Sequence, residues 1–317
     1  MASDPSFTIV VGGPTGSGKS ALAVALAGLF NGTIINADSM QVYDGLRILT
    51  ARPGPDTEAA APHRLYGVMD PGARCSAGRW RELALGEIES ARTAGRVPIL
   101  VGGTGLYLRA LLKGLAPVPE IPDPVRLEAA QLFEELGRHA FHARLATLDA
   151  EGAARVGPGN TQRLLRLYEV VTATGRTLHD WQAQPAAGVG IGPGTVIELV
   201  LWPTRGALYA AINARVEHMV QAGVLAEVEA LLARTLPADV PVMKAVGLRE
   251  FAAHLRGEMS LEAAVSRAQT ATRRYAKRQM TWFRHQMPDA VRLEGFGGDV
   301  LDAAEAVIRE RKSAQAG

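Results

Sequence analysis

The sequence contains a single cysteine, Cys75, in 317 residues. One thiol cannot form an internal disulfide framework, so the chain suits a reducing compartment, and Cys75 is expected to be a small buried or half-buried side chain. Long apolar runs are missing too. None approaches the roughly 20 residues that a transmembrane helix needs, and no signal-peptide pattern opens the chain. We therefore expect a cytoplasmic protein without a membrane partner.

An excess of charge of one sign is missing as well. The formal net charge is only +2 at pH 7, so the total does not indicate nucleic-acid binding, and only a local patch could. The seven histidines show no metal-ligand spacing and no Gly-x-Ser-x-Gly element occurs, so zinc chemistry and serine hydrolysis have no support. The length predicts one large or two ordinary domains.

Short apolar runs alternate with amphipathic stretches in the first third of the chain. The runs at 7–13, 33–39 and 97–105 are typical of buried strands, and apolar residues at helical spacing separate them. This alternation predicts an α/β fold with a parallel sheet flanked by helices. Ligands of such sheets bind at the carboxyl ends of the strands.

Proline and glycine divide the chain. Four prolines fall within Leu115–Pro124, and a second Gly/Pro-rich linker spans Gln184–Gly194. The pattern between them is helical, whereas Thr195–Trp202 has the pattern of a strand again. We therefore expect an α/β core of residues 1–120 and 191–317, interrupted by an all-helical insertion domain at 121–190.

The stretch GPTGSGKS follows the first predicted strand and opens the next helix. It fits the pattern G-x-x-x-x-G-K-[ST]. Its members are Gly13, Pro14, Thr15, Gly16, Ser17, Gly18, Lys19 and Ser20. The loop N–H groups and the helix N-terminus attract phosphate, Lys19 meets phosphate oxygens, and the Ser20 hydroxyl is the usual Mg²⁺ ligand. The motif predicts a P-loop NTPase-like phosphate site and leaves open whether ATP or another diphosphate binds.

Two polar residues follow the other predicted strands. Asp38 can be a catalytic or substrate-orienting carboxylate that accepts a proton, or it can cap a helix. Thr104, in a glycine-lined turn, can orient a substrate or cap the helix after it. The pattern alone favours neither alternative.

A basic stretch near the C-terminus is the clearest charge feature. No acidic residue occurs between Glu262 and Asp289. The predicted basic helix at 266–286 carries Arg267, Arg273, Arg274, Lys277, Arg278 and Arg284, with Tyr275, Trp282 and Phe283 between them. Such a helix suits phosphate contacts and base stacking on RNA. The alternative is a solvated helix whose aromatic residues pack inward.

Six motifs together point to a family. In order they are GGPTGSGKS, NADSMQVY, TARP, VGGTGLYLRALL, MKAVGLREF and RRYAKRQMTWFR. In this set the chain resembles the tRNA dimethylallyltransferases, also called tRNA isopentenyltransferases, over its whole length. The resemblance implies transfer of a dimethylallyl group from dimethylallyl diphosphate to the exocyclic N6 of an adenosine. That adenosine lies immediately 3′ of the anticodon in tRNAs that read codons beginning with U. The expected cofactor is Mg²⁺, the expected partner is the tRNA anticodon stem-loop, and a monomer is expected.

The resemblance also implies roles for particular residues. Asp38 matches the proposed general base, Thr104 matches a residue that positions the target nucleotide, and Lys19 belongs to the loop that binds the diphosphate. Arg215 resembles a basic residue that reaches the diphosphate. The residues expected to contact tRNA are Asp38, Ser39, Met40, Gln41, Thr104, Arg126, Gln162, Arg163, Leu164, Leu165, Arg166, Arg274, Lys277 and Arg278.

The chain departs from the usual family text at two places. YRGLDIGTAKP is YDGLRILTARP at 43–53, and PHHLID is PHRLYG at 62–67, which affects contacts at the edge of the substrate rather than the reaction. Two alternative functions are a small-molecule P-loop kinase and an adenylate isopentenyltransferase acting on free nucleotide. The kinase explains the loop and the sheet, but it explains neither the insertion nor the basic helix. An adenylate isopentenyltransferase acts on a free nucleotide, so it does not need an insertion that binds tRNA.

Overall fold

The computed structural model describes residues 7–185, 190–191, 194–237 and 239–316. The chain forms two compact units, one of Met1–Leu112 with Ile191–Gly317 and the other of Lys113–Gly190. The second unit starts at Lys113, where helix α4 (Gly105–Lys113) ends, rather than at residue 121. Of the predicted linker Gln184–Gly194, residues 186–189 and 192–193 lie outside the described residues.

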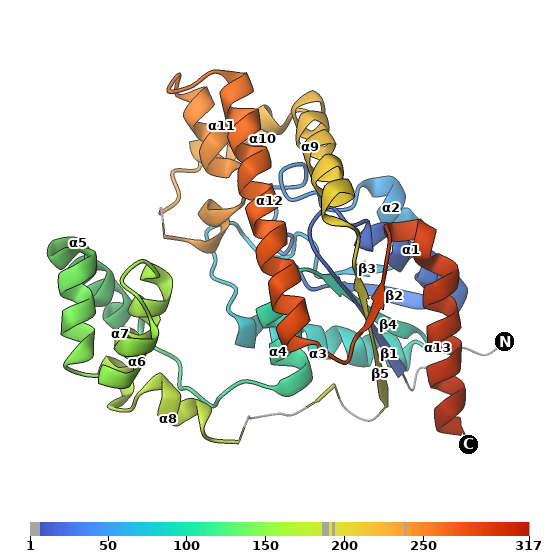
Figure 1. The fold of residues 1–317 in the computed structure, drawn as a ribbon, viewed down its shortest axis with the longest axis horizontal. Coiled ribbons are helices and arrows are strands. Elements are labelled where there is room, and N and C mark those ends of the chain that lie inside the picture. Colours follow the sequence, from blue (N-terminus) through green and yellow to red (C-terminus); the bar gives the residue numbers. More distant parts are fainter. Residues whose placement is uncertain (1–6, 186–189, 192–193, 238, 317) are drawn as a thin grey trace. The chain divides into compact units, whose positions relative to one another are not determined.

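The first unit is built on one sheet of six strands within its described residues (Figure 1). These are β1 (Phe7–Gly12), β2 (Gly32–Asn36), β3 (His63–Arg64), β4 (Val97–Gly102), β5 (Thr195–Leu201) and β6 (Val291–Leu293). Their spatial order is β3-β2-β4-β1-β5-β6, and every pair is parallel. Gly12 pairs with Gly102, so β1 and β4 end level with one another at the middle of the sheet.

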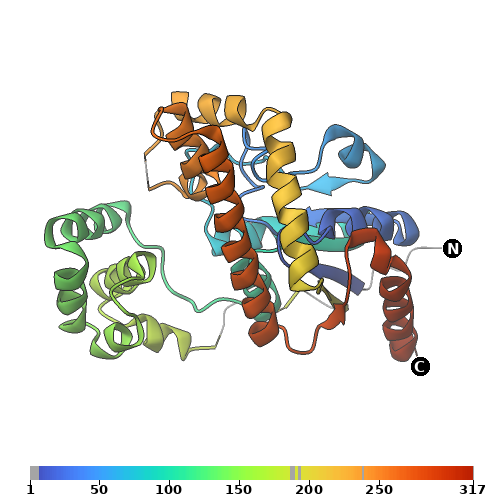
Figure 2. The same cartoon turned by 45° about the horizontal axis from the view of Figure 1, so that its top comes forward.

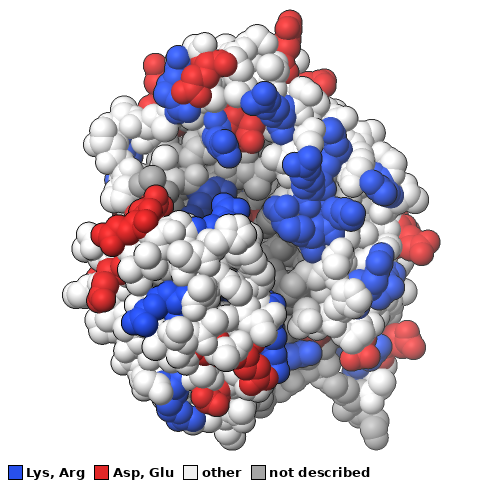
Figure 3. Space-filling view, turned by 60° about the vertical axis from the view of Figure 1, so that its left-hand side comes forward, with Lys and Arg blue, Asp and Glu red and all other residues white. Residues whose placement is uncertain are grey.

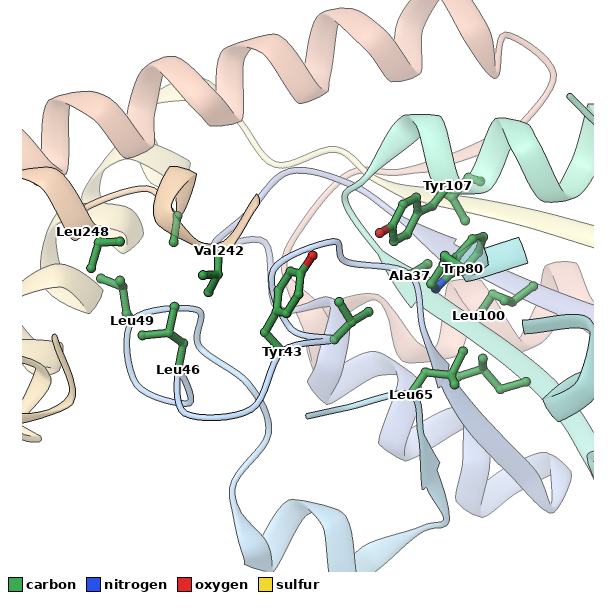
Figure 4. Close-up of a cluster of buried hydrophobic side chains, with 14 of the residues drawn as sticks. Ala37, Tyr43, Leu46, Leu49, Leu65, Trp80, Leu100, Tyr107, Val242 and Leu248 are labelled. Carbon is green, nitrogen blue, oxygen red and sulfur yellow. The ribbon is translucent and has the colours of Figure 1, made fainter. Parts of the chain in front are cut away.

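Alternate residues of the central strands enter two separate cores. Val10 and Leu100 belong to one hydrophobic cluster, whereas Ile9, Val11 and Ile99 belong to another. Because successive side chains of a strand point to opposite faces, both faces of the sheet are covered. The predicted parallel sheet with helices on both faces is therefore confirmed. Figure 4 shows part of the first cluster, in which Trp80 and Tyr107 stack at 4.5 Å between ring centroids.

The helices of the first unit occupy the segments between and after these strands. In chain order they are α1 (Lys19–Phe30), α2 (Pro55–Ala60), α3 (Ala77–Thr93), α4, α9 (Arg205–Gln221), α10 (Val224–Ala233), η1 (Pro241–Lys244), α11 (Leu248–Leu255), α12 (Leu261–Gln286), η2 (Gly297–Val300) and α13 (Leu301–Ala316). No helix in the described ranges combines the length and the apolar character needed to cross a membrane.

The regular elements of the second unit, within its described residues, are all helices. It contains α5 (Asp123–Ala146), α6 (Ala150–Arg155), α7 (Thr161–Thr174) and α8 (Leu178–Gln182). Phe141, Leu145 and Leu164 form its core, and all three are fully buried. Asn160 caps α7 by accepting a hydrogen bond from the Arg163 N–H, which replaces one of the partners that a helix start lacks.

Helix α12 lies across the carboxyl ends of β1 and β4, beside α9 (Figure 2). Its inward side chains meet glycines there. A Cβ on Gly12 would lie 2.6 Å from the Phe283 ring, and one on Gly105 would overlap the Trp282 ring. Glycine at these positions therefore lets the helix approach the backbone of the sheet closely.

The end of β4 gives the first testable prediction. A Cβ on Gly102 would overlap the Ala37 carbonyl group, which is rigid backbone at the end of β2, whereas one on Gly86 in α3 would meet open space. We expect Gly102→Ala to lower the free energy of unfolding by about 1–3 kcal/mol or more. Gly86→Ala, the matched control, should raise it by about 0.4–1 kcal/mol, because alanine is the better helix former.

Urea denaturation of the purified variants measures both effects. A Gly102→Ala variant as stable as the wild type would contradict the close approach of β2 and β4.

Candidate active site

The loop Gly13–Ser20 joins β1 to α1 at the carboxyl end of the sheet. Gly13, Gly16 and Gly18 have φ angles of 141°, 83° and 82°, a region that glycine adopts without strain. A side chain on Gly18 would also come within 2.8 Å of the Gly297 backbone nitrogen. The loop thus takes the form of a phosphate cradle, with the positive end of the α1 dipole beside it.

Lys19 lies at the start of α1 with its side chain folded onto the loop. Its Nζ donates a hydrogen bond of 2.7 Å to the Pro14 carbonyl oxygen. Burial lowers the pKa of Lys19 to about 8, and the Arg215 charge lowers it as well, whereas the Asp38 carboxylate opposes the shift. A phosphate group would therefore find a cation that is only partly protonated above neutral pH.

Arg215 comes to the same loop from α9. Its Nη2 donates a 2.8 Å hydrogen bond to the Thr15 hydroxyl. Its buried Nε has no hydrogen-bond partner among the described residues. Burial lowers the pKa of Arg215 from its ordinary value, and the nearby Asp38 charge raises it. The structure thus places a second cation beside the loop.

Asp38 follows β2 and forms a tight turn. Its Oδ1 accepts a 2.9 Å hydrogen bond from the Met40 N–H, and the Asn36 side chain holds its backbone on both sides. Turns rather than a helix follow Asp38, so it does not serve as a helix cap. Its charge raises the pKa of both Lys19 and Arg215, which puts the carboxylate in the same site as the loop.

Thr104 connects the end of β4 to the segment of Asp38. Its hydroxyl oxygen accepts a 2.9 Å hydrogen bond from the Ser39 N–H, and the hydroxyl donates to Ser39 Oγ at 3.2 Å. The backbone oxygen of Thr104 accepts hydrogen bonds from Tyr107 and Leu108 in the first turn of α4. The residue therefore supports the helix through its backbone, while its side chain orients Ser39.

A cavity of about 160 Å³ opens beside the loop, and Thr15, Asp38 and Arg215 line its polar part. Lys19 and Thr104 are not among its lining residues. Apolar side chains of the lining come from the loop after β2 and from α9, α11 and α12, and they are Met40, Leu49, Val216, Met219, Phe251 and Ala268. The cavity can therefore hold a ligand that is anionic at one end and apolar at the other.

Some lining residues were given no role by the sequence. Lys244 and Phe251 both lie within the MKAVGLREF motif, which was a usable signal. Tyr275 lines the cavity from α12, and burial raises its pKa while a side-chain hydrogen bond with Thr104 lowers it. Gln41, whose contact with tRNA stays a prediction, donates from its amide to the carbonyl oxygens of Thr50 and Ala51 and so closes the loop.

The expected tRNA contacts divide between the two units. On α12, Arg274, Lys277 and Arg278 are exposed, and Figure 3 shows Lys and Arg side chains gathered on one part of the surface with few Asp or Glu among them. Phe283 is buried and Trp282 half-buried. These aromatic rings therefore pack inward, as expected in the alternative interpretation of the stretch as a solvated helix.

The second unit holds the other expected tRNA contacts. Arg126 is half-buried and donates to the Ile121 carbonyl oxygen at 3.2 Å. Of the segment at 162–166, Gln162 and Arg163 are exposed, while Leu165 and Arg166 are half-buried. Leu164 is a correction. Its side chain is fully buried in the core of this unit and is not available to RNA.

The two departures from the family text have structural partners. Where the family has Arg and Asp at positions 44 and 47, this chain has Asp44 and Arg47. Asp44 lies 3.7 Å from Arg52, and Arg47 lies 3.5 Å from Glu58. Tyr66 belongs to the second departure. Burial raises its pKa, and the Asp38 charge raises it as well, which shows that Tyr66 lies near the site.

A family model described as IPP transferase matches residues 41–286, well over half of the chain. The chain belongs to this family. A tRNA dimethylallyltransferase of Rhodospirillum centenum is 56% identical over 290 residues, covering 90% of this chain and 91% of the relative. The one of Rhodospirillum rubrum is 57% identical over 289 residues, covering 91% and 88%.

Solved structures of the IPP transferase family agree with the fold. The tRNA isopentenylpyrophosphate transferase of Bacillus halodurans has a TM-score of 0.68 at 29% identity and covers 99% of this chain and 100% of its own. A eukaryotic dimethylallyltransferase solved acting on tRNA has a TM-score of 0.78 at 26% identity and covers 95% and 77%. The family resemblance inferred from the six motifs is therefore confirmed.

The lowered pKa of Lys19 predicts how anion binding depends on pH. The free protein loses the Lys19 proton near pH 8, whereas a bound diphosphate keeps the ammonium protonated, so binding takes up a proton. Affinity for inorganic diphosphate should fall by up to about tenfold per pH unit above pH 8. Calorimetry in buffers of different ionisation enthalpy measures the uptake.

The matched control is Lys19→Arg, which stays protonated throughout this range. Subtracting its uptake removes the contribution of the ligand's own titration. Equal proton uptake by the wild type and Lys19→Arg would contradict the prediction.

Proposed function

We propose that this chain transfers a dimethylallyl group from dimethylallyl diphosphate to the exocyclic amine of the adenosine 3′-adjacent to the anticodon, in tRNAs that read codons beginning with U, and releases diphosphate. The observation that carries the proposal is one cavity lined by the phosphate loop at Thr15, by Asp38, by Arg215 and by apolar side chains. Membership of the IPP transferase family supports the same reaction.

Stabilising the leaving diphosphate is the main task of the loop side. Lys19 and Arg215 provide two partly desolvated cations, and the loop N–H groups and the α1 dipole add fixed partial charges. As the carbon–oxygen bond breaks, negative charge grows on the diphosphate and these groups stabilise it. The allylic carbon assists, because its developing positive charge is delocalised.

Magnesium fits the site as a companion of the diphosphate. No cluster of three or more His, Cys, Asp or Glu suited to a metal occurs in the part of the chain that the structure describes. Ser20, in the first turn of α1, would hold the ion together with diphosphate oxygens and water, which suits an ion that keeps several waters. Mg²⁺ held there would neutralise charge on the leaving group.

Asp38 acts on the acceptor side. The amine becomes cationic as its new bond forms, and the Asp38 carboxylate takes the proton. Thr104 holds the backbone of Ser39 and so fixes the segment that carries Asp38. The target base must leave the stack of the anticodon loop, which costs a few kcal/mol.

We propose that both units bind tRNA through contacts with its phosphate groups. Arg274, Lys277 and Arg278 supply them from α12, and the exposed residues Gln162 and Arg163 supply them from α7. These contacts offset the cost of extruding the base. We further propose a cytoplasmic location, since tRNA is the acceptor and one free thiol, Cys75, suits a reducing compartment. The expected monomer stays a prediction.

One assay separates this function from its alternatives. The protein is incubated with labelled dimethylallyl diphosphate and, separately, with total tRNA, AMP or ATP. Label in tRNA supports the proposal, and label only in AMP or ATP supports an adenylate isopentenyltransferase. The apolar cavity lining favours the prenyl donor over a kinase substrate, and phosphoryl transfer from ATP without prenyl transfer would overturn the proposal.

Asp38→Asn tests the general base. The amide keeps an oxygen that can accept from the Met40 N–H, so the turn survives, but it cannot take a proton. We expect the single-turnover transfer rate to fall about 10²–10⁴-fold while the Kd for tRNA changes little.

Asp44→Asn is the control, because it removes an exposed carboxylate from the same region. Loss of tRNA affinity with transfer intact in the bound complex would refute the base assignment.

Leu49 gives a prediction on donor length. Its side chain lines the cavity, and the family text has glycine at this position, so a smaller residue is compatible with the fold. A cavity of about 150 Å³ holds benzene, so the present 160 Å³ fits a five-carbon group rather than a ten-carbon one. Leu49→Gly should raise the ratio of kcat/KM for geranyl over dimethylallyl diphosphate by about tenfold or more.

Leu46→Val is the matched control, since Leu46 packs in the core of the same region. An unchanged ratio in Leu49→Gly would show that this side chain does not limit donor length.

A further inference from the structure

Gln279 is a buried amide that bonds both to the phosphate loop and to the turn that carries Thr104. It lies on α12 and is only 5% exposed. Its Oε1 accepts a hydrogen bond of 2.8 Å from the Thr15 N–H, and its Nε2 donates one of 2.9 Å to the Gly103 carbonyl oxygen. A buried side-chain amide with each end bonded to a different backbone segment fixes the distance between those segments.

The position of Gln279 is itself fixed by packing. A Cβ on Gly103 would overlap the Gln279 amide nitrogen, so glycine is needed for the amide to reach the carbonyl. One turn further along α12, Trp282 and Phe283 occupy the spaces above Gly105 and Gly12. The helix therefore cannot slide without disturbing three close contacts.

Each partner of Gln279 leads to a different part of the site. Thr15 accepts a hydrogen bond from Arg215 on the diphosphate side. Gly103 is followed by Thr104, whose hydroxyl binds the Ser39 N–H beside Asp38 on the acceptor side. Beyond the pairing of β1 with β4, Gln279 is thus a side-chain link between the group that holds the leaving diphosphate and the group that holds the acceptor.

We propose that Gln279 is a positioning residue that sets the separation between the diphosphate loop and the Thr104 turn. The role rests on the proposed function. In the transfer, the carbon–oxygen bond to the diphosphate breaks as the bond to the adenosine nitrogen forms, and the proton leaves to Asp38. Both reacting groups must approach along one line, and a displacement of about 1 Å can cost about 10²-fold in rate.

Two variants remove the link while keeping the helix. Gln279→Leu removes both hydrogen bonds, and Gln279→Met does so with an unbranched, flexible side chain. We expect the single-turnover rate at saturating substrates to fall by about 10²-fold. The KM values for both substrates and the Kd for inorganic diphosphate should stay within about threefold, because the N–H groups after Thr15 still bind the anion.

The control is Gln269→Leu, on the same helix. Gln269 donates to the Asn213 carbonyl oxygen and to Glu217, away from the loop and the Thr104 turn. Its loss should leave the rate unchanged. Thermal denaturation of the variants reports whether they remain folded at the assay temperature.

Each outcome decides the proposal. A slow step with unchanged binding in a folded Gln279 variant supports it. An unchanged rate, or a rate that falls only in proportion to lost diphosphate binding, overturns the positioning role while the wild type and Gln269→Leu still transfer. Absence of transfer by the wild type would overturn the proposed function itself, and the role of Gln279 with it.

Discussion

Helix α12 fits against the carboxyl ends of β1 and β4 because glycines stand where its side chains arrive. Phe283 fills the space above Gly12, and Trp282 fills the space above Gly105. The strand ends held in this way carry the phosphate loop and the Thr104 turn, so one packing contact closes the core and supports the chemistry. The exposed side of the same helix carries cations. One helix therefore both supports the site and provides the surface proposed for tRNA.

The charges of the site balance one another in a partly desolvated space. Burial lowers the pKa of both Lys19 and Arg215, the Arg215 charge lowers that of Lys19 further, and the Asp38 carboxylate opposes the shift in both. Two cations held close together in this way are poised to accept a multivalent anion, because the anion relieves their repulsion when it binds. The site is therefore organised for its ligand by electrostatic strain as well as by shape.

The sequence predicts the loop at Gly13–Ser20 residue by residue, because positive φ angles demand glycine at fixed positions. It also predicts the parallel sheet and the helical unit, whose periodicities extend over many residues. Strands β3 and β6 were missed, since two or three residues are too short to show a period. The link through Gln279 was missed for another reason. Its partners lie 264 and 176 residues away, and nothing local distinguishes a buried glutamine from an exposed one.

The reversed charges at Asp44 and Arg47 constrain how this loop can change. Asp44 faces Arg52, and Arg47 faces Glu58, so each charge has a partner of opposite sign. Restoring arginine at position 44 alone would put two guanidinium groups side by side, and restoring aspartate at 47 alone would put it beside a carboxylate. Each position is therefore coupled to its own partner, so a charge reversal at 44 should be accompanied by a change at 52, and one at 47 by a change at 58.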